Sequence, residues 1–420
     1  MIIYRENYFK KEEDRMSKKI KLETPSYIKE FSCIGGKCED SCCIGWDIDI
    51  DRISFKKYFK TDNAEMRKMF QKNIHNNEYC TSPDVDYGRV KLKKGKRCAF
   101  LDDENLCVIY KNLGEDHLSN VCTCYPRILN LVDGHYERSL DVACPEAARI
   151  LLAKEEGIKF ENKEENLDKH IVSGVVDTKS KEVKDYILKY FNDLIDMSIK
   201  IIQDRNYDLS KRLFALGYFL ERAEEEFEEK GSLDKYLNNL DVCEVLEDYE
   251  KNKLNYILQV SFFKAVLTDL DVFKEIDSES FKKYTRELYD GFNLEEIKDV
   301  TEKSEFFIEA YEEYDKKYLD KYSYIFENYL ANFMYNNLFP FSESDSSFDG
   351  YIMLLVRFSI VRFYLVGRFL KNECESSENI INMIQSFSKA VEHHKTFLSD
   401  LLQDIKDKEF DNMEFAKTLI

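Results

Sequence analysis

Glycine and proline are scarce in this sequence, with 14 and 5 among 420 residues. Collagen-like chains, linker-rich chains and turn-dense all-β folds need many more, so these classes are excluded. Tryptophan occurs once, and an excess of positive charge is missing, since the formal net charge is −19. A chain this acidic repels phosphates, so it is a poor non-specific binder of nucleic acid. Apolar residues make up 44%, which excludes wholesale disorder.

The first residues of the sequence predict an intracellular start. Residues 1–19 (MIIYRENYFKKEEDRMSKK) contain no apolar core of the length that a signal peptide needs. We therefore expect a cytoplasmic protein. In that reducing compartment, cysteines are more often metal ligands or redox groups than structural disulfides.

One long hydrophobic run is present, in residues 351–370. It contains three arginines, and each would cost roughly 2.5–3.5 kcal/mol at the centre of a bilayer. We therefore predict a helix buried in a bundle and no contact with a membrane. Arg357 and Arg368 lie eleven positions apart, which places them on one face of that helix. We expect them to pair with carboxylates of the acidic half of the chain.

Charge and cysteine content both divide the chain near residue 150. Up to that point 26 basic residues face 25 acidic ones, and beyond it 36 face 56, so the balance changes from +1 to −20. Ten of the twelve cysteines lie between Cys33 and Cys144. We predict three parts: a charged lead-in over 1–30, a compact cysteine-rich metal-binding module with short strands over 31–150, and a larger acidic helical domain over 151–420.

The hydrophobic pattern supports a mainly α fold class. Residues 46–53 (WDIDIDRI) alternate apolar and acidic side chains, which is typical of a short strand. Residues 186–195 place their large apolar side chains on one stripe, as in an amphipathic helix. A further helix is predicted over 213–230, with Gly231 as its C-terminal cap. The same pattern predicts helices in three later stretches: 255–273, 306–339 and 376–409.

The cysteines give the strongest chemical signal. Cys33, Cys38, Cys42 and Cys43 lie within eleven residues, among glycine and small polar residues, so their thiols can converge. Thiolates are soft ligands that suit zinc or iron–sulfur clusters, and the spacing does not separate these two. A second set follows, with Cys98, Cys107, Cys122, Cys124 and Cys144. Four cysteines are instead expected to be buried apolar thiols: Cys80, Cys124, Cys243 and Cys374.

Two familiar fingerprints are missing. The C-x3-C-x2-C triplet of radical enzymes is absent, and so is a glycine-rich G-x-G-x-x-G loop after a strand. The residues alone therefore indicate a cysteine-ligated metalloprotein with a helical partner domain.

Four motifs carry a resemblance to a known family. They occur in the order FSCIGGKCEDSCCIGWDIDID, CAFLDDENLCVIY, LGEDHLSNVCTCYPR and RSLDVACPEAARILL, within residues 20–155. Together they resemble the flagellin lysine-N-methylase family. The middle motifs are also similar to putative zinc- or iron-chelating cysteine domains.

The resemblance implies a protein-lysine N-methyltransferase that acts on flagellin and uses S-adenosylmethionine. It also implies a [4Fe–4S] cluster. Zinc is the alternative metal that the cysteine spacing leaves open. About four of the family's eight cysteine positions would ligate one cluster: Cys33, Cys38, Cys42, Cys43, Cys98, Cys107, Cys122 and Cys144. The alternative hypothesis is a zinc- or iron-chelating protein with a helical interaction domain and no methyltransferase activity.

Three other residues inside or beside these motifs are candidates for the cofactor site. Arg127 and Arg138 are candidates to hold the carboxylate of the methyl donor, or equally to tie the module together through loop carbonyls. Trp46 follows the first cysteines directly, and we expect it to shield the site from water.

Overall fold

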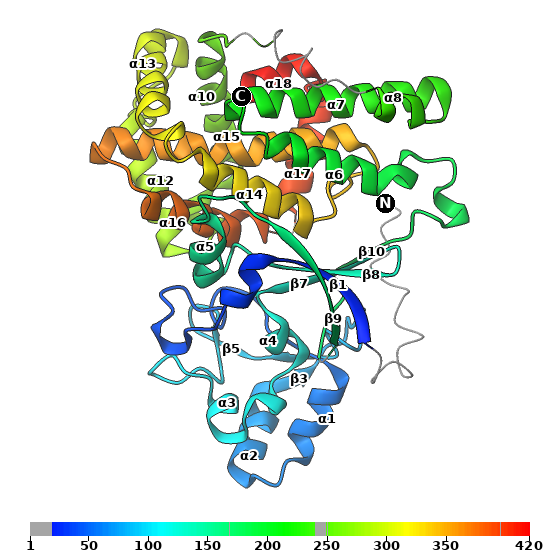
Figure 1. Ribbon diagram of the computed structural model, residues 1–420. Helices are drawn as coiled ribbons and strands as arrows, with labels where there is room; N and C mark the ends of the chain where they lie inside the picture. Colours follow the sequence, from blue (N-terminus) through cyan, green and yellow to red (C-terminus); the bar gives the residue numbers. More distant parts are fainter. Residues whose placement is uncertain (1–18, 168, 240–248, 250, 395) are drawn as a thin grey trace. The chain divides into compact units, whose positions relative to one another are not determined.

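The computed structural model describes residues 19–167, 169–239, 249, 251–394 and 396–420. Within them the chain forms two compact units. The described part of the cysteine unit consists of residues 19–147, 159–167 and 169–176. The described part of the helical unit consists of residues 148–158, 177–239, 249, 251–394 and 396–420. The fold class is mainly α, as predicted (Figure 1).

This division differs from the predicted boundary at residue 150. The chain leaves the cysteine unit within helix α5 (Pro145–Leu152) and returns at residue 159. It returns because strands β9 (Phe160–Asn166) and β10 (Gly174–Val176) pair with strands of that unit. The predicted lead-in over residues 1–30 is also not separate from the cysteine unit. Its strand β1 (Lys19–Pro25) belongs to the same sheet. Residues 1–18 lie outside the described part.

The main sheet of the cysteine unit has five strands in the order β10-β7-β8-β1-β9. Strands β7 (Arg127–Val132) and β8 (His135–Leu140) form a hairpin whose two turn residues, Asp133 and Gly134, have positive φ. A turn of this kind matches the right-handed twist of the strands. Strand β1 runs parallel to β8 and antiparallel to β9. Side chains from several strands of this sheet form a small buried apolar cluster: Leu22, Leu129, Leu131, Tyr136 and Val175.

The rest of the cysteine unit is made of short elements. They are β2 (Asp49–Ile50), α1 (Arg52–Lys60), α2 (Ala64–Asn73), β3 (Ile74–Asn76), β4 (Gly88–Val90), β5 (Leu92–Lys93), β6 (Arg97–Cys98), α3 (Val108–Leu113) and α4 (Asn120–Cys124). Their core includes Tyr58 and Phe70, whose stacked rings lie 4.3 Å apart. The strand predicted over 46–53 is confirmed but short. It ends because Asp51 caps α1, its carboxylate accepting a hydrogen bond from the Ser54 N–H at 2.8 Å.

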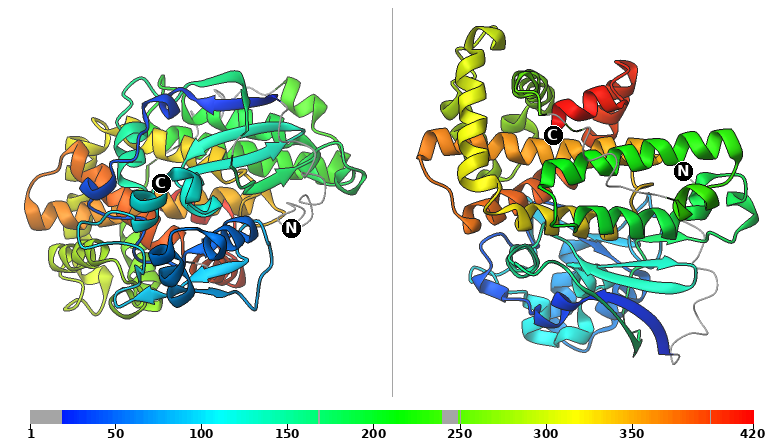
Figure 2. Two further views of the ribbon diagram at one scale, coloured as in Figure 1. Left: turned by 90° about the horizontal axis from the view of Figure 1, so that it is seen from below. Right: turned by 45° about the horizontal axis from the view of Figure 1, so that its top comes forward.

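The helical unit is built almost entirely of helices. They are α6 (Phe191–Ile202), α7 (Leu209–Lys230), α8 (Asp234–Asn238), α10 (Leu254–Leu270), α11 (Val272–Glu275), α12 (Glu279–Phe292), α13 (Ser304–Tyr314), α14 (Ser323–Asn336), α15 (Ser347–Asn372), α16 (Ser377–Phe387), α17 (Phe397–Asp407) and α18 (Met413–Leu419). Figure 2 shows the green pair α6 and α7 packed side by side.

Most predicted helices are confirmed, with differences at their ends. Helix α7 ends at Gly231, whose left-handed φ of 66° makes it the predicted C-terminal cap. The stripe at 186–195 begins as a short 3₁₀ turn and becomes α-helical only at Phe191. The stretch 306–339 forms two helices instead of one, because a π-helical turn at Asp315–Leu319 separates α13 from α14.

Helix α15 is the core helix of the helical unit and contains the long hydrophobic run. Among the described residues it is the one helix long and apolar enough to cross a membrane, yet its most apolar window is entirely buried within the protein. The predicted pairing of its arginines is confirmed. Arg357 donates to Glu343 at 2.7 Å, and Arg368 donates to Glu287 at 2.8 Å. The hydrophobic run is therefore a segment of the protein core. Its arginines form ion pairs with carboxylates of the same unit.

The third arginine of α15 lies deepest. Arg362 has no solvent exposure, and its Nε donates to the Asp315 carboxylate at 3.1 Å. Its guanidinium also lies over the rings of Tyr256 and Tyr311, 5.2 and 5.1 Å from their centroids. Lys251 adds a second cation to Asp315, at 2.8 Å. The π-helical turn thus places a carboxylate where the buried arginine needs one.

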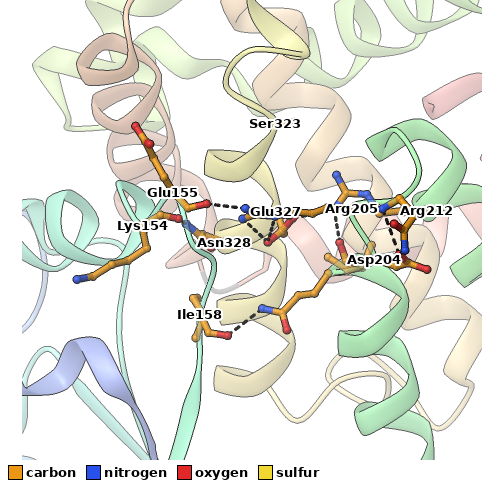
Figure 3. A network of polar contacts seen from close by, with 12 residues as sticks. Lys154, Glu155, Ile158, Asp204, Arg205, Arg212, Ser323, Glu327 and Asn328 are labelled. Atoms are coloured by element: carbon orange, nitrogen blue, oxygen red, sulfur yellow. Dashed lines mark hydrogen bonds and ion pairs between the residues drawn. The ribbon is translucent and has the colours of Figure 1, made fainter.

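A second buried network, centred on α14, is shown in Figure 3. The Glu327 carboxylate, 2% exposed, accepts hydrogen bonds from Arg205 and Arg212, both at 2.8 Å. The next residue, Asn328, donates its amide to the carbonyl oxygen of Lys154 at 2.8 Å. These contacts hold the segment that follows α5 against the helices of the helical unit.

Candidate metal centre

All eight cysteines of the predicted ligand set lie in the cysteine unit, and every described cysteine is a free thiol. Within the described ranges, no three His, Cys, Asp or Glu side chains converge closely enough to surround a single metal ion. An iron–sulfur cluster spreads its thiolate ligands around several irons, so these lie farther apart than the ligands of one ion. Interactions among the thiols show which of them are neighbours.

Four thiols gather beside the core formed by α1, α2 and α3. Cys98, at the end of β6, is buried, and its N–H donates to the Cys43 carbonyl at 2.9 Å. Cys43 and Cys107 pack against the same core. The thiols of Cys98, Cys107 and Cys122 each interact electrostatically with Cys43. We call Cys43, Cys98, Cys107 and Cys122 the core group.

The other four thiols lie in loops. Cys33 and Cys38 flank a 3₁₀ turn at Gly35–Lys37, and the Cys38 N–H donates to the Gly35 carbonyl at 3.0 Å. The thiol of Cys38 interacts with Cys33, and that of Cys144 interacts with Cys38. The thiol of Cys42 forms a side-chain hydrogen bond with the thiol of its neighbour Cys43. It also interacts electrostatically with Cys122 and Cys33. We call Cys33, Cys38, Cys42 and Cys144 the loop group.

Each group contains one cysteine directly before a helix. Cys107 is the N-cap of α3, and Cys144 precedes α5. Burial raises the pKa of Cys144 to about 11, while hydrogen bonds from the N–H groups of Ala147 and Glu146 oppose that rise. The pKa of Cys107 is also raised by burial and lowered in part by two N–H groups of α3. N–H donors of this kind stabilise a thiolate, the form that binds metal.

Trp46 is bound to the cysteine loop by a hydrogen bond. Its indole N–H donates to the Cys42 carbonyl at 2.7 Å, which fixes the ring over the loop. The ring meets Tyr125 edge-to-face, with centroids 5.3 Å apart. The Tyr125 hydroxyl in turn interacts with Cys144 and Cys42. Two aromatic rings thus lie beside the loop group, and the shielding role of Trp46 stays a prediction.

Arg127 and Arg138 lie on the hairpin β7–β8. The Arg127 guanidinium lies over the ring of Phe31, 5.2 Å from its centroid, and the side chain is exposed. Arg138 is paired with Glu165 of β9 at 2.5 Å. Both arginines interact with the thiol of Cys124. Their role in holding the methyl donor stays a prediction.

The expectation for the remaining cysteines was wrong where the structure describes them. Cys374 is exposed because it follows the end of α15, and Cys80 and Cys124 are only partly buried. Cys80 lies in a polar turn, where its thiol donates to the Asp86 carboxylate at 3.3 Å. Cys243 lies outside the described residues.

Sequence analysis missed Tyr125 and the two helix starts as parts of the site. A signal for one helix start was present, because Pro145 and Glu146 directly follow Cys144. Proline at the first helical position and an acidic residue in the first turn are typical of a helix N-terminus. Tyr125 lies within one of the quoted motifs, but its contact with Trp46 could not be predicted, because the two residues are far apart in the chain.

The chemistry of these side chains fits an iron–sulfur cluster. Such clusters are held by four thiolates, and each group supplies four thiols. Each group also has backbone N–H groups directed at one of its sulfurs. Of the residues present, the cysteines would hold the cluster, and Trp46 and Tyr125 would shield it.

The fold and the site together define a class of two-unit proteins, in which a cysteine-rich unit accompanies a larger helical unit. The family model described as the FliB lysine N-methylase C-terminal domain matches residues 196–419, more than half of the chain. The chain belongs to this FliB lysine N-methylase family.

Named relatives agree with this family. The flagellar biosynthetic protein FliU of Salmonella muenchen is 34% identical over 140 residues, which are 32% of this chain and 79% of that protein. The lysine-N-methylases of Salmonella typhimurium and Salmonella choleraesuis are each 33% identical over 140 residues. That match covers 32% of this chain and 33% of each of those two relatives. No solved structure was found that matches the chain.

Proposed function

We propose that this protein is a cytoplasmic protein-lysine N-methyltransferase that methylates flagellin. The methyl donor is S-adenosylmethionine, and the cysteine unit holds a [4Fe–4S] cluster. The observation that carries this proposal is the family match over residues 196–419, which coincides with the larger part of the helical unit. The names of the relatives, a lysine-N-methylase and a flagellar biosynthetic protein, support the substrate class.

The reaction moves one methyl group. The lone pair of a neutral lysine amine attacks the sulfonium methyl carbon, the carbon–sulfur bond breaks, and S-adenosylhomocysteine leaves. The new ammonium then loses a proton. Because free lysine has a pKa near 10.4, the site must desolvate the amine or provide an acceptor for its proton.

The residues of the chain contribute binding and shielding. The part of the chain beyond residue 150 has a net charge of −20, which attracts lysine-bearing substrates over long range. Trp46 and Tyr125 exclude water beside the loop group. When bound, a cluster with three cysteine ligands offers an open iron for the amino acid end of the donor, whereas one with four ligands serves as a structural clamp.

The direct test is co-expression with flagellin followed by intact mass measurement. We expect flagellin to gain mass in steps of one methylene group, at lysine residues. A Cys107→Ser variant should abolish the shift, and a Cys374→Ser variant should preserve it, since Cys374 is exposed and lies outside both groups. An unshifted flagellin beside a metal-loaded protein would contradict the proposal and favour the chelating protein.

A further inference from the structure

We propose that an apolar strip on the surface of the helical unit docks a lysine-bearing amphipathic helix of the protein substrate. The strip consists of three residues of α10 and two residues in or directly before α18: Leu254, Leu258, Phe262, Phe410 and Phe415. This inference rests on the proposed function for the identity of the partner. The surface itself is argued from exposure, packing and charge.

Helix α10 is apolar on its outer side as well as on its inner side. Leu254 and Leu258 are 59% and 52% exposed, and Phe262, one turn further on, is partly buried. Residues four positions apart are neighbours on a helix, so these three side chains form one row. The opposite side of α10 packs into the core, where Val260 and Phe263 are completely buried. A surface helix normally has polar residues on its outer side, so an exposed apolar row indicates a surface that a partner covers.

Two phenylalanines extend this row onto the neighbouring helix. The rings of Phe262 and Phe415 meet edge-to-face, with centroids 5.2 Å apart. Phe415 stacks on Phe410 at 4.8 Å, and Phe410 is 37% exposed. Helix α18 is fixed against α10, because the Asn255 amide donates to the Lys417 carbonyl at 2.7 Å. Five large apolar side chains therefore form one continuous surface.

Helix α13 borders the strip on its other side with negative charge. It contains no basic residue and four glutamates, all of them exposed: Glu305, Glu309, Glu312 and Glu313. Glu312 pairs at 2.5 Å with Lys253, which precedes α10, and Glu309 lies on the same face of α13 as Glu312. Further along α10, Lys264 donates to the carbonyl of Ile297, which precedes α13. The two helices therefore run antiparallel, and Figure 1 shows α10 between α13 and α18.

The side of the strip next to α18 is acidic as well. Glu409, Asp411 and Glu414 accompany the two phenylalanines, and Lys417 is the one basic residue in the stretch 409–419. An apolar strip between acidic borders is complementary to a helix whose apolar face is flanked by lysines. A second copy of this chain fits poorly, because it would bring the same negative borders. An anionic membrane surface would be repelled for the same reason.

The test measures the binding of purified flagellin monomer to the full chain by isothermal titration calorimetry. No methyl donor is added, so binding is separated from catalysis. Leu258→Glu places a charge in the strip, and Glu309→Lys reverses one charge of its border. We expect Leu258→Glu to weaken binding at least about tenfold and Glu309→Lys to weaken it less. Added salt should also weaken binding to the natural sequence, because it screens exposed charges.

Matched controls come from the cysteine unit. Ile53→Glu changes another apolar residue, which is 72% exposed, and Glu65→Lys reverses another exposed carboxylate on a helix. Both controls should bind flagellin as the natural sequence does. Circular dichroism checks that each variant folds, and Leu254→Glu replaces Leu258→Glu if that variant does not. Equal affinity in Leu258→Glu and Ile53→Glu, or no binding of flagellin by the natural sequence, would overturn the docking proposal.

Two further measurements separate the remaining outcomes. Light scattering without flagellin gives the oligomeric state, and a dimer that Leu258→Glu dissociates would show that the strip joins two copies, against the proposal. Methylation of flagellin with the same KM in the natural sequence and in Leu258→Glu would overturn docking alone. Flagellin that binds through the strip but is never methylated would instead overturn the proposed function and leave the docking surface supported.

Discussion

Buried charges in the helical unit and thiols in the cysteine unit are stabilised in different ways. Arg362 is enclosed by a carboxylate and two aromatic rings, all from the same unit. Glu327 likewise has two arginines. The thiols of the cysteine unit have neighbours of their own kind, which repel each other once ionised. Ion pairs between side chains therefore stabilise the buried charges described in the helical unit, whereas ionised thiols of the cysteine unit would repel one another without a bound cation.

Removal of metal should give the largest difference between the units. Bound metal contributes to folding, on the order of 10 kcal/mol for structural zinc sites. We expect chelation of anaerobically purified protein to raise amide hydrogen exchange in residues 98–124 to nearly unprotected levels. Exchange in α15 should stay slow, because its core needs no metal. Equal acceleration in both regions, measured by mass spectrometry, would show that the units do not differ in this way.

Breaking the buried ion pair should have the next largest effect. Arg362→Met leaves the Asp315 carboxylate buried with one strong partner fewer, which costs about 3–5 kcal/mol of unfolding free energy. Urea unfolding followed by circular dichroism measures the loss. The matched control is Arg222→Met, which removes the partly exposed pairs of Arg222 with Glu225 and Glu226 and should cost far less than Arg362→Met. Equal losses in the two variants would mean that burial is not what makes the pair matter.

A single methyl group should disturb the packing of the helical unit. A Cβ at Gly291 of α12 would overlap the carbonyl oxygen of Gly367 in α15. Gly291→Ala should therefore lower the unfolding free energy by about 1–3 kcal/mol, although alanine favours a helix over glycine. Thermal unfolding distinguishes the steric clash from the gain in helix propensity. An increase in stability would show that α12 and α15 move apart without cost and would contradict the prediction.

The smallest expected effect is a loss of unfolding free energy at acidic pH. Burial alone would raise the pKa of Asp315, but Arg362 and Lys251 outweigh it, so the pKa lies below its ordinary value of 3.8. The unfolded state then binds the proton more readily, so stability from this group is present above about pH 4. It is lost as the pH falls through the lower folded pKa, with a slope of at most about 1.4 kcal/mol per pH unit. Urea titrations between pH 6 and 3 should show a shallower decline for Asp315→Asn, and parallel declines would contradict this role.

Much of the helical unit could be predicted from the sequence, because its signals are local. Hydrophobic stripes and a glycine cap lie within one helix each, as at Gly231. The arginines of α15 predicted carboxylate partners, since a buried charge requires one. Which carboxylate it would be could not be predicted. Asp315 is 47 residues from Arg362, and the π-helical turn that presents it follows from packing.

The eight cysteines of the candidate site came from the family resemblance, and their role as ligands stays a prediction. Their packing could not be predicted from the sequence, as with Cys43, which lies against a core of distant residues. That core includes Ile48 and Ile50 together with Phe70 and Phe100, which come from other segments of the chain. The return of β9 and β10 was missed for the same reason, since pairing partners lie far apart in sequence.

The return of the chain at residue 159 has a consequence for dissecting the protein. A fragment that stops at residue 150 would strip β9 from β1 and leave a long sheet edge open to aggregation. A fragment that begins at residue 177 would lack Lys154, whose carbonyl binds Asn328. No single cut yields two intact halves. During synthesis, likewise, the sheet that begins at residue 19 cannot close until the ribosome has passed residue 176.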